Sequence, residues 1–91
     1  MSNAINGKTS TGFEFCIPAE RLDDYELVEQ LIELEKGDMM VVVPIVKALM
    51  DDDEEKRLKE HVKAMNGGRC TFSGMAQEIS EIFLGSSTGK N

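Results

Sequence analysis

The sequence has few of the residue types that build most catalytic and nucleic-acid-binding sites. Among its 91 residues it contains no Trp, one Tyr, four Phe and one His. Such a chain has little aromatic surface on which bases could stack. Its 17 acidic and 10 basic residues give a net charge of −7, which repels phosphate backbones. We therefore expect no general nucleic-acid binding, whereas a basic protein partner is compatible with the charge.

Cysteines and long apolar runs are also scarce. Cys16 and Cys70 lie far apart and form no CxxC pair, and no secretory signal precedes them, so reduced cytosolic thiols are expected. The longest apolar run, residues 39–46, includes Pro44 and is far shorter than the roughly 20 residues of a membrane-spanning helix. We expect a cytoplasmic protein with no membrane partner.

The length indicates one domain over residues 1–91, with an ordered core at about residues 5–84 and a flexible Gly- and Ser-rich tail at residues 85–91. A domain of this size buries roughly 60–65% of its extended surface. That suffices for one modest core but not for a deep cleft between two lobes. Binding or assembly is therefore favoured over catalysis.

A short strand is expected near the N-terminus. Phe13, Phe15 and Ile17 alternate with other residues at a period of two, and Pro18 ends the pattern because proline cannot donate to a strand ladder. The Asn6-Gly7 dipeptide is typical of a tight turn and would close a small hairpin with the first residues.

Residues 19–36 have helical periodicity, and Gly37 is expected to end the helix. Their apolar side chains sweep about 240° of the helix, well beyond the usual stripe of about 100°. Such a helix needs two partners, its own core and either a neighbouring subunit or a client, although a central place in a small bundle explains the same arc. One stripe holds Leu22, Tyr25, Val28 and Ile32, and the adjoining one holds Leu27, Leu31 and Leu34.

The apolar residues 39–50 predict a second helix, with Asp38 as its N-cap and its start near Met40 or at Pro44. Residues 41–43 alone would also suit a buried strand, because Val is β-branched. The all-round apolar character indicates burial. Core filling is also favoured over an adaptable binding surface for the five internal methionines, Met39, Met40, Met50, Met65 and Met75.

Two more helices complete the expected fold. The third opens on five acidic residues at 51–55, which complement the helix dipole, and runs to Met65, where Asn66-Gly67-Gly68 ends it. The fourth begins at Thr71 or Ser73. The inward side chains are Leu58, Val62 and Met65 on the third helix and Met75, Ile79, Ile82 and Phe83 on the fourth. The predicted class is mainly α, a small four-helix domain with a short N-terminal β-strand or hairpin.

No set of residues has the spacing of a known chemical site. The acidic run at 51–55 lacks the alternating spacing and later Glu of a calcium loop, and Gly7-Lys8-Thr9 lacks the earlier glycine of a phosphate-binding loop. His61 is the only ready general base near neutral pH, and no acid or nucleophile stands at a recognisable spacing from it. We therefore predict no catalytic, cofactor-binding or metal-binding residues, and no enzyme.

The order of several short segments carries a family resemblance over about residues 5–84. These segments are Asn6-Gly7-Lys8-Thr9 before Phe13-Glu14-Phe15, Asp23-Asp24 at a helix start, Gly37-Asp38 before an apolar helix, Leu49-Met50 before an acidic turn, Leu58-Lys59-Glu60-His61-Val62, and Glu81-Ile82-Phe83. Together they resemble the small tail assembly chaperones of long-tailed bacteriophages and prophages of Gram-positive bacteria. Residues 39–43 depart from the family by being richer in β-branched side chains.

The resemblance implies a non-enzymatic protein of the host cytoplasm. Such chaperones coat the aggregation-prone tape measure protein, recruit tail tube subunits and are absent from the finished virion. A longer product made by ribosomal frameshifting is also common in the family. Leu27, Leu31 and Leu34, on the far shoulder of the wide apolar arc, are the candidate partner-binding residues, and the oligomeric state is left open.

Two alternatives compete with this interpretation. One is an acidic regulatory adaptor whose carboxylates bind a basic protein partner, which would make the complex sensitive to salt. The other is a minor structural tail-completion protein that stays in the virion.

Overall fold

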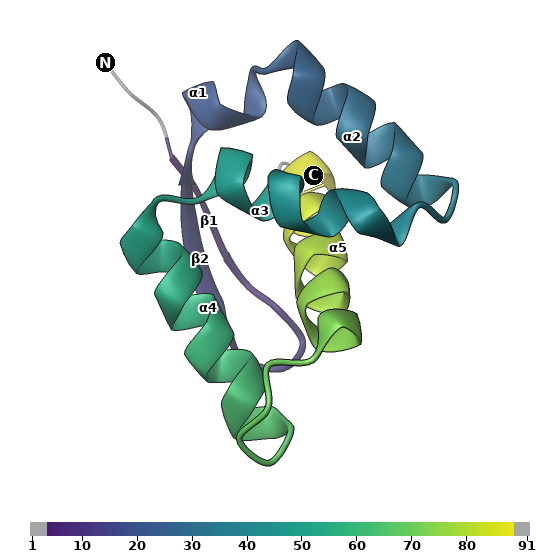
Figure 1. Cartoon of the computed structure of the whole chain (residues 1–91). Coiled ribbons are helices and arrows are strands. Elements are labelled where there is room, and N and C mark those ends of the chain that lie inside the picture. Colours follow the sequence, from purple (N-terminus) through teal and green to yellow (C-terminus); the bar gives the residue numbers. More distant parts are fainter. Residues whose placement is uncertain (1–3, 89–91) are drawn as a thin grey trace.

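The computed structural model describes the backbone of residues 4–88 and the side chains of residues 4–83. The fold is mainly α with a two-stranded N-terminal hairpin, as the sequence predicts (Figure 1). Its elements are β1 (Ala4–Lys8), β2 (Glu14–Pro18), α1 (Ala19–Leu22), α2 (Tyr25–Glu35), the 3-10 turn η1 (Met39–Val41), α3 (Val42–Leu49), α4 (Asp52–Met65) and α5 (Phe72–Thr88).

The hairpin turn lies later in the chain than the sequence suggested. β1 and β2 pair antiparallel, and residues 9–12 connect them, with the Thr9 amide donating to the Phe13 carbonyl at 2.9 Å. The prediction that Asn6-Gly7 forms the turn is wrong, because Gly7 lies inside β1 opposite Phe15. A Cβ on Gly7 would stand 2.6 Å from the Phe15 ring, so this glycine serves close packing.

The predicted helix at residues 19–36 is divided into α1 and α2. Asp24 has extended backbone angles, and its Oδ1 accepts hydrogen bonds from the amides of Glu26 at 3.0 Å and Leu27 at 3.3 Å. This side chain caps a new helix, so the chain restarts there. At the other end, Gly37 has a φ of +102° and the amide of Asp38 donates to the carbonyl of Glu33 at 2.9 Å. The predicted stop at Gly37 is confirmed, in the form of a Schellman motif.

The segment after Gly37 is helical and not a strand. Asp38 accepts a hydrogen bond from the Met40 amide at 3.1 Å, which confirms it as an N-cap. Pro44 lies in the first turn of α3, where no intrahelical amide bond is lost. The prediction of all-round burial is wrong, because Met39, Met40 and Val43 are exposed. The core lies on one side of α3 only.

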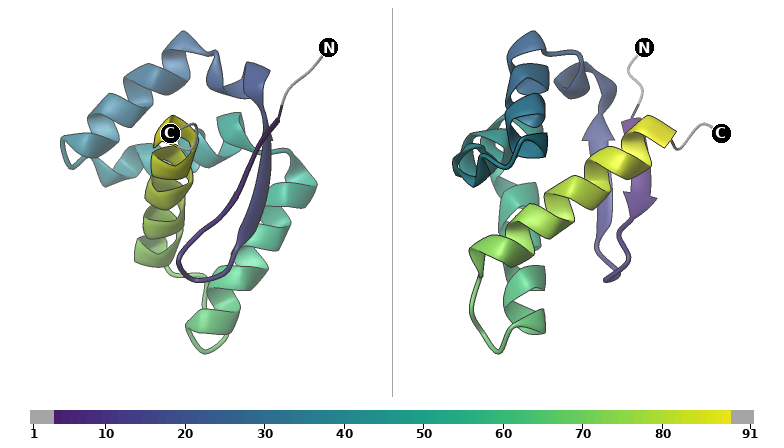
Figure 2. Two further views of the ribbon diagram at one scale, coloured as in Figure 1. Left: turned by 180° about the vertical axis from the view of Figure 1, so that it is seen from behind. Right: turned by 90° about the vertical axis from the view of Figure 1, so that its right-hand side faces the viewer.

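One apolar cluster joins the elements. Figure 2 shows how the elements are arranged, from two further sides. The strands lie along the molecule between α4 and α5, and α2 with α3 forms a helical pair at one end. The most deeply buried side chains of this cluster are Ile17, Leu27, Val42, Ile45, Val46, Leu49, Leu58, Val62, Ile79 and Ile82. The inward positions predicted for α4 and α5 are confirmed, with Phe83 partly buried against the core, except for Met65, which is exposed at the end of α4.

The last helix is longer than predicted. Thr71 caps it, with its Oγ1 accepting from the Gly74 amide at 3.0 Å, and α5 continues through residues 85–88. The rest of the predicted tail, residues 89–91, lies outside the described residues. None of the helices described combines the length and the apolar character needed to cross a bilayer.

Candidate functional site

Helix α2 has two contrasting apolar sides. Leu27 is 1% exposed, and Leu31 and Leu34 are partly buried against the core. The prediction that these three leucines form an outward, partner-binding side is wrong. The periodicity of the sequence separates two stripes but does not show which one faces the core.

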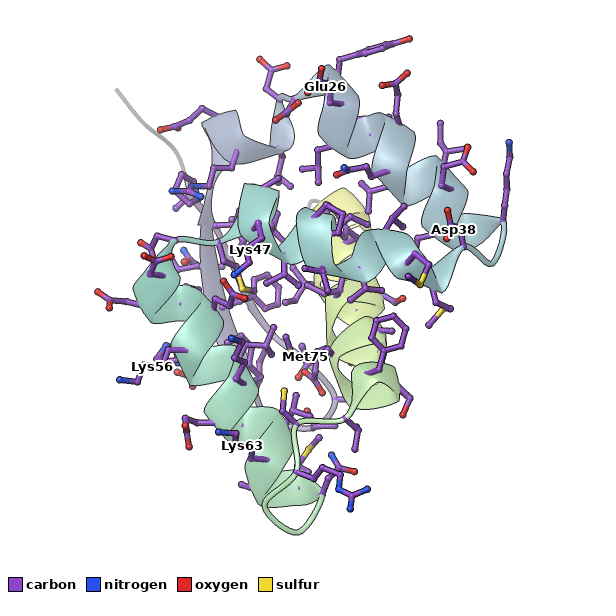
Figure 3. All side chains as sticks on the ribbon, viewed as in Figure 1. Glu26, Asp38, Lys47, Lys56, Lys63 and Met75 are labelled. Atoms are coloured by element: carbon purple, nitrogen blue, oxygen red, sulfur yellow. The ribbon has the colours of Figure 1, made fainter. Side chains whose placement is uncertain are left out.

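The exposed side of α2 belongs to the other stripe. Tyr25 is 78% exposed, Val28 44% and Ile32 50%. An acidic row runs beside them at the same spacing, and a shallow hollow of about 610 Å³ lies along this side, lined by Tyr25, Glu26, Glu29, Gln30, Ile32 and Glu33. We call Tyr25, Glu26, Val28, Glu29, Ile32 and Glu33 the outer face of α2. Figure 3 shows Glu26 near the start of α2 and Asp38 beyond its end.

The charge of the protein is concentrated around this helix. Residues 19–38 contain eight acidic and two basic residues, so this segment has a net charge of −6 within a total of −7. Its one ion pair among residues 4–83 joins Lys36 Nζ to Glu33 Oε2 at 3.7 Å, and both side chains are at least half exposed. An exposed ion pair of this kind contributes little to the stability of the fold. The carboxylates of the outer face are therefore available to an external cation.

A second apolar surface lies between α3, α4 and the start of α5. Val43 and Phe72 are exposed beside a groove of about 290 Å³. In its lining, Lys47 Nζ donates to Oε1 of the buried Glu55 at 3.1 Å, and Lys59 Nζ lies 3.7 Å from Glu55 Oε2. We call this the α3–α5 groove, and Lys47 and Met75 from its lining are labelled in Figure 3.

The methionines divide between the core and the surface. Met50 and Met75 are buried, whereas Met39, Met40 and Met65 are exposed. The prediction that the five methionines fill the core is therefore wrong for three of them. The exposed thioethers of Met39 and Met40 add apolar surface at η1, and that of Met65 adds it at the end of α4.

A polar cluster fixes the tip of the hairpin to α4 and α5. Thr11 Oγ1 donates to Glu78 Oε2 at 2.6 Å and lies 2.9 Å from His61 Nε2. Thr11 thus joins the tip of the hairpin to α4 through His61 and to α5 through Glu78. We call this cluster the hairpin clamp.

A second clamp lies beside the first. The amide of Ser10 donates to Glu81 Oε1 at 2.6 Å, and Ser10 Oγ donates to Glu81 Oε2 at 2.7 Å. The amide bond, followed by the hydroxyl bond and one from Gln77, lowers the pKa of Glu81 below its ordinary value of 4.5. These bonds close the hairpin tip onto α5.

The polar cluster borders a hollow of about 690 Å³ on the side of α4, where Arg57 lies 4.8 Å from the centre of the Phe13 ring. His61 stands out in the sequence as the only histidine, whereas nothing marks Thr11 or Glu78 as its partners. The partners are 50 and 67 positions apart in the chain, and no local pattern links them.

The acidic run at residues 51–55 has a structural role at the start of α4. Asp51 Oδ1 accepts from the Glu54 amide at 2.8 Å and caps the helix. Residues 4–83 contain no group of three or more His, Cys, Asp or Glu side chains that could hold a metal ion.

Comparisons of the chain with protein-family models, with curated proteins and with solved structures give no match.

Two surfaces of the fold are suited to macromolecular contact, the outer face of α2 and the α3–α5 groove. The former combines exposed apolar side chains with three carboxylates, and it lies within the most acidic segment of the chain, residues 19–38.

Proposed function

We propose that this protein is a non-enzymatic tail assembly chaperone of a phage or prophage, which binds the tape measure protein and helps to recruit tail tube subunits in the host cytoplasm. The observation that carries the proposal is the outer face of α2. It presents Tyr25, Val28 and Ile32 to solvent on a helix capped at both ends. The resemblance over about residues 5–84 supports the same function.

An exposed apolar row on a capped helix suits a helical client. Asp24 and Gly37 fix the ends of α2, so the row is ordered before any partner binds. Docking of an amphipathic helix on an apolar surface is a common mode of recognition. The neighbouring carboxylates keep such a surface soluble while it is unoccupied.

The α3–α5 groove supports a second contact. Its lining shares no residue with the hollow on α2, so the two surfaces are separate. A chaperone that holds the tape measure protein and also recruits tube subunits requires two such surfaces. We assign the outer face of α2 to the former and the groove to the latter.

The charge distribution favours one competing function, an acidic adaptor that binds a basic protein. The net charge of −6 within residues 19–38 is the observation behind it. An adaptor of this kind would bind chiefly through charge, so its complex would dissociate as salt rises. A chaperone complex centred on apolar contacts would survive.

Co-expression with the tape measure protein of the same genome tests the proposal. We expect the tape measure protein to be insoluble alone, and to become soluble and co-purify with this chain at high salt. The experiment is repeated with any frameshifted longer product. Insoluble tape measure protein in both cases would contradict the proposal, and detection of this chain in purified particles by mass spectrometry would favour a tail-completion protein.

A further inference from the structure

We infer that the outer face of α2 binds a basic amphipathic helix, in which a row of apolar side chains is flanked by Lys or Arg. The inference deepens the proposed function. It rests on that function only for the identity of the protein that contains the helix. The chemistry of the partner follows from the spacing of two rows on α2.

The apolar row sets the geometry of the contact. Tyr25, Val28 and Ile32 stand at i, i+3 and i+7, so they follow one line along the helix. The 11 residues of α2 span about 16 Å, or three turns. A partner helix of similar length, with apolar side chains at the same spacing, would cover this row.

The acidic row sets the charge of the partner. Glu26, Glu29 and Glu33 also stand at i, i+3 and i+7, beside the apolar row. Glu26 and Glu29 have no ion pair within residues 4–83, and Glu33 has only the exposed contact with Lys36. Lys or Arg at the edge of a docked helix would form charge-assisted hydrogen bonds with these carboxylates.

Other occupants fit this face less well. A second copy docked through the same face would bring two acidic rows together, and like charges across an interface are unfavourable. An anionic membrane surface would be repelled for the same reason. A basic helix satisfies both rows together.

Two synthetic helical peptides of about 18 residues, roughly 27 Å long, provide the probe. They share one leucine row and differ only in its flanks, which are Lys in one peptide and Glu in the other. Binding to the full chain is measured by fluorescence anisotropy at low and at high salt. We expect the Lys-flanked peptide to bind, more weakly at high salt, and the Glu-flanked peptide not to bind.

Matched variants locate the contact. Glu29→Lys is compared with Glu60→Lys, which makes the same charge change at an exposed position of α4. Ile32→Ser is compared with Met65→Ser, because Ile32 and Met65 are exposed to similar extents, 50% and 43%, and Met65 lies outside both surfaces. We expect each α2 variant to weaken binding by at least about tenfold, and its control to leave it unchanged. Far-UV circular dichroism checks that every variant is folded.

Several outcomes would overturn the inference. These are equal binding of both peptides, binding of neither, or equal effects of the α2 variants and their controls. The proposed function fails separately. If the Lys-flanked peptide binds at α2 but the tape measure protein does not co-purify, the inference stands and the function fails. If the tape measure protein co-purifies regardless of Glu29→Lys and Ile32→Ser, the function stands and the inference fails.

Discussion

Tyr25 and Leu27 lie two positions apart in α2 and face opposite directions. Tyr25 is 78% exposed and Leu27 is 1% exposed. Two helical positions differ by about 200°, so one short segment supplies both the core and the outer face. One part of the wide apolar arc of this region therefore packs in the core, and the other part faces solvent.

The two sides of α2 should differ in their contribution to stability. We expect Leu27→Ala to lower the free energy of unfolding by about 2–5 kcal/mol, because it leaves a cavity in the core. Ile32→Ala, at a half-exposed position, should lower it by less than about 1 kcal/mol. Urea denaturation followed by circular dichroism measures both. Similar losses for the two variants would show that the outer face is not free in solution.

The same orientation changes the expectation for the other leucines. Leu31 and Leu34 pack against the core, so Leu31→Asp should unfold part of the chain and not simply remove a partner contact. The denaturation midpoint of Leu31→Asp, compared with that of Ile32→Asp, checks this. An unchanged midpoint for Leu31→Asp would restore the leucines as surface residues.

Thr11→Val should destabilise the hairpin clamp. It keeps the shape of the side chain but removes the hydroxyl that donates to Glu78. The Glu78 side chain is buried, and its Oε1 has no hydrogen-bond partner among the described residues. The expected loss is about 1–3 kcal/mol. Thr11→Ser keeps the hydroxyl and serves as the control in the same denaturation series. Equal stability of the two variants would mean that the bond contributes nothing.

Glu81 should make stability depend on pH in the acidic range. The bonds from Ser10 lower the pKa of Glu81 in the folded state below 4.5, so the unfolded chain binds the proton more readily. This contribution is present above the ordinary pKa and is lost as pH falls through the folded value. Glu81→Gln should flatten that part of the stability profile, measured by thermal unfolding at several pH values. An unchanged profile would refute the assignment to Glu81.

Gly74→Ala should be destabilising although alanine favours helices. A Cβ at this position would stand 2.7 Å from both Val62 Cγ1 and Thr71 Oγ1. Helix propensity would contribute at most about 1 kcal/mol, whereas overpacking costs about 1–3 kcal/mol. Ser73→Ala, one position earlier and exposed, is the control. A rise in the melting temperature of Gly74→Ala would show that the start of α5 can move away from α4.

Local chemistry was enough to predict much of the fold. Helix ends depend on groups only a few residues apart, so their signals lie in short stretches of sequence. This holds for the caps at Asp38 and Thr71 and for the stop at Gly37. The apolar periodicity runs through Asp24 and so predicted one helix over residues 19–36, although Asp23-Asp24 stood among the family segments as a helix start. The turn at Asn6-Gly7 was misplaced because packing of Phe15 over Gly7 outweighs the local preference of the dipeptide.

The candidate site was predicted less well. The apolar arc at residues 19–36 indicated a surface beyond the core, but only tertiary packing decides that Val28 faces outward and Leu27 inward. The clamp formed by Thr11, His61 and Glu78 depends on contacts across 50 and 67 positions of the chain. Contacts between residues so far apart leave no periodic pattern in the sequence.

The most direct test of the account compares two double variants in co-expression with the tape measure protein. Val28→Ser/Ile32→Ser alters the outer face of α2, and Val43→Ser/Phe72→Ser alters an equal number of exposed apolar residues at the α3–α5 groove. We expect the tape measure protein to co-purify with the wild-type chain and the groove variant but not with the α2 variant. Retention by the α2 variant together with loss by the groove variant would contradict this expectation.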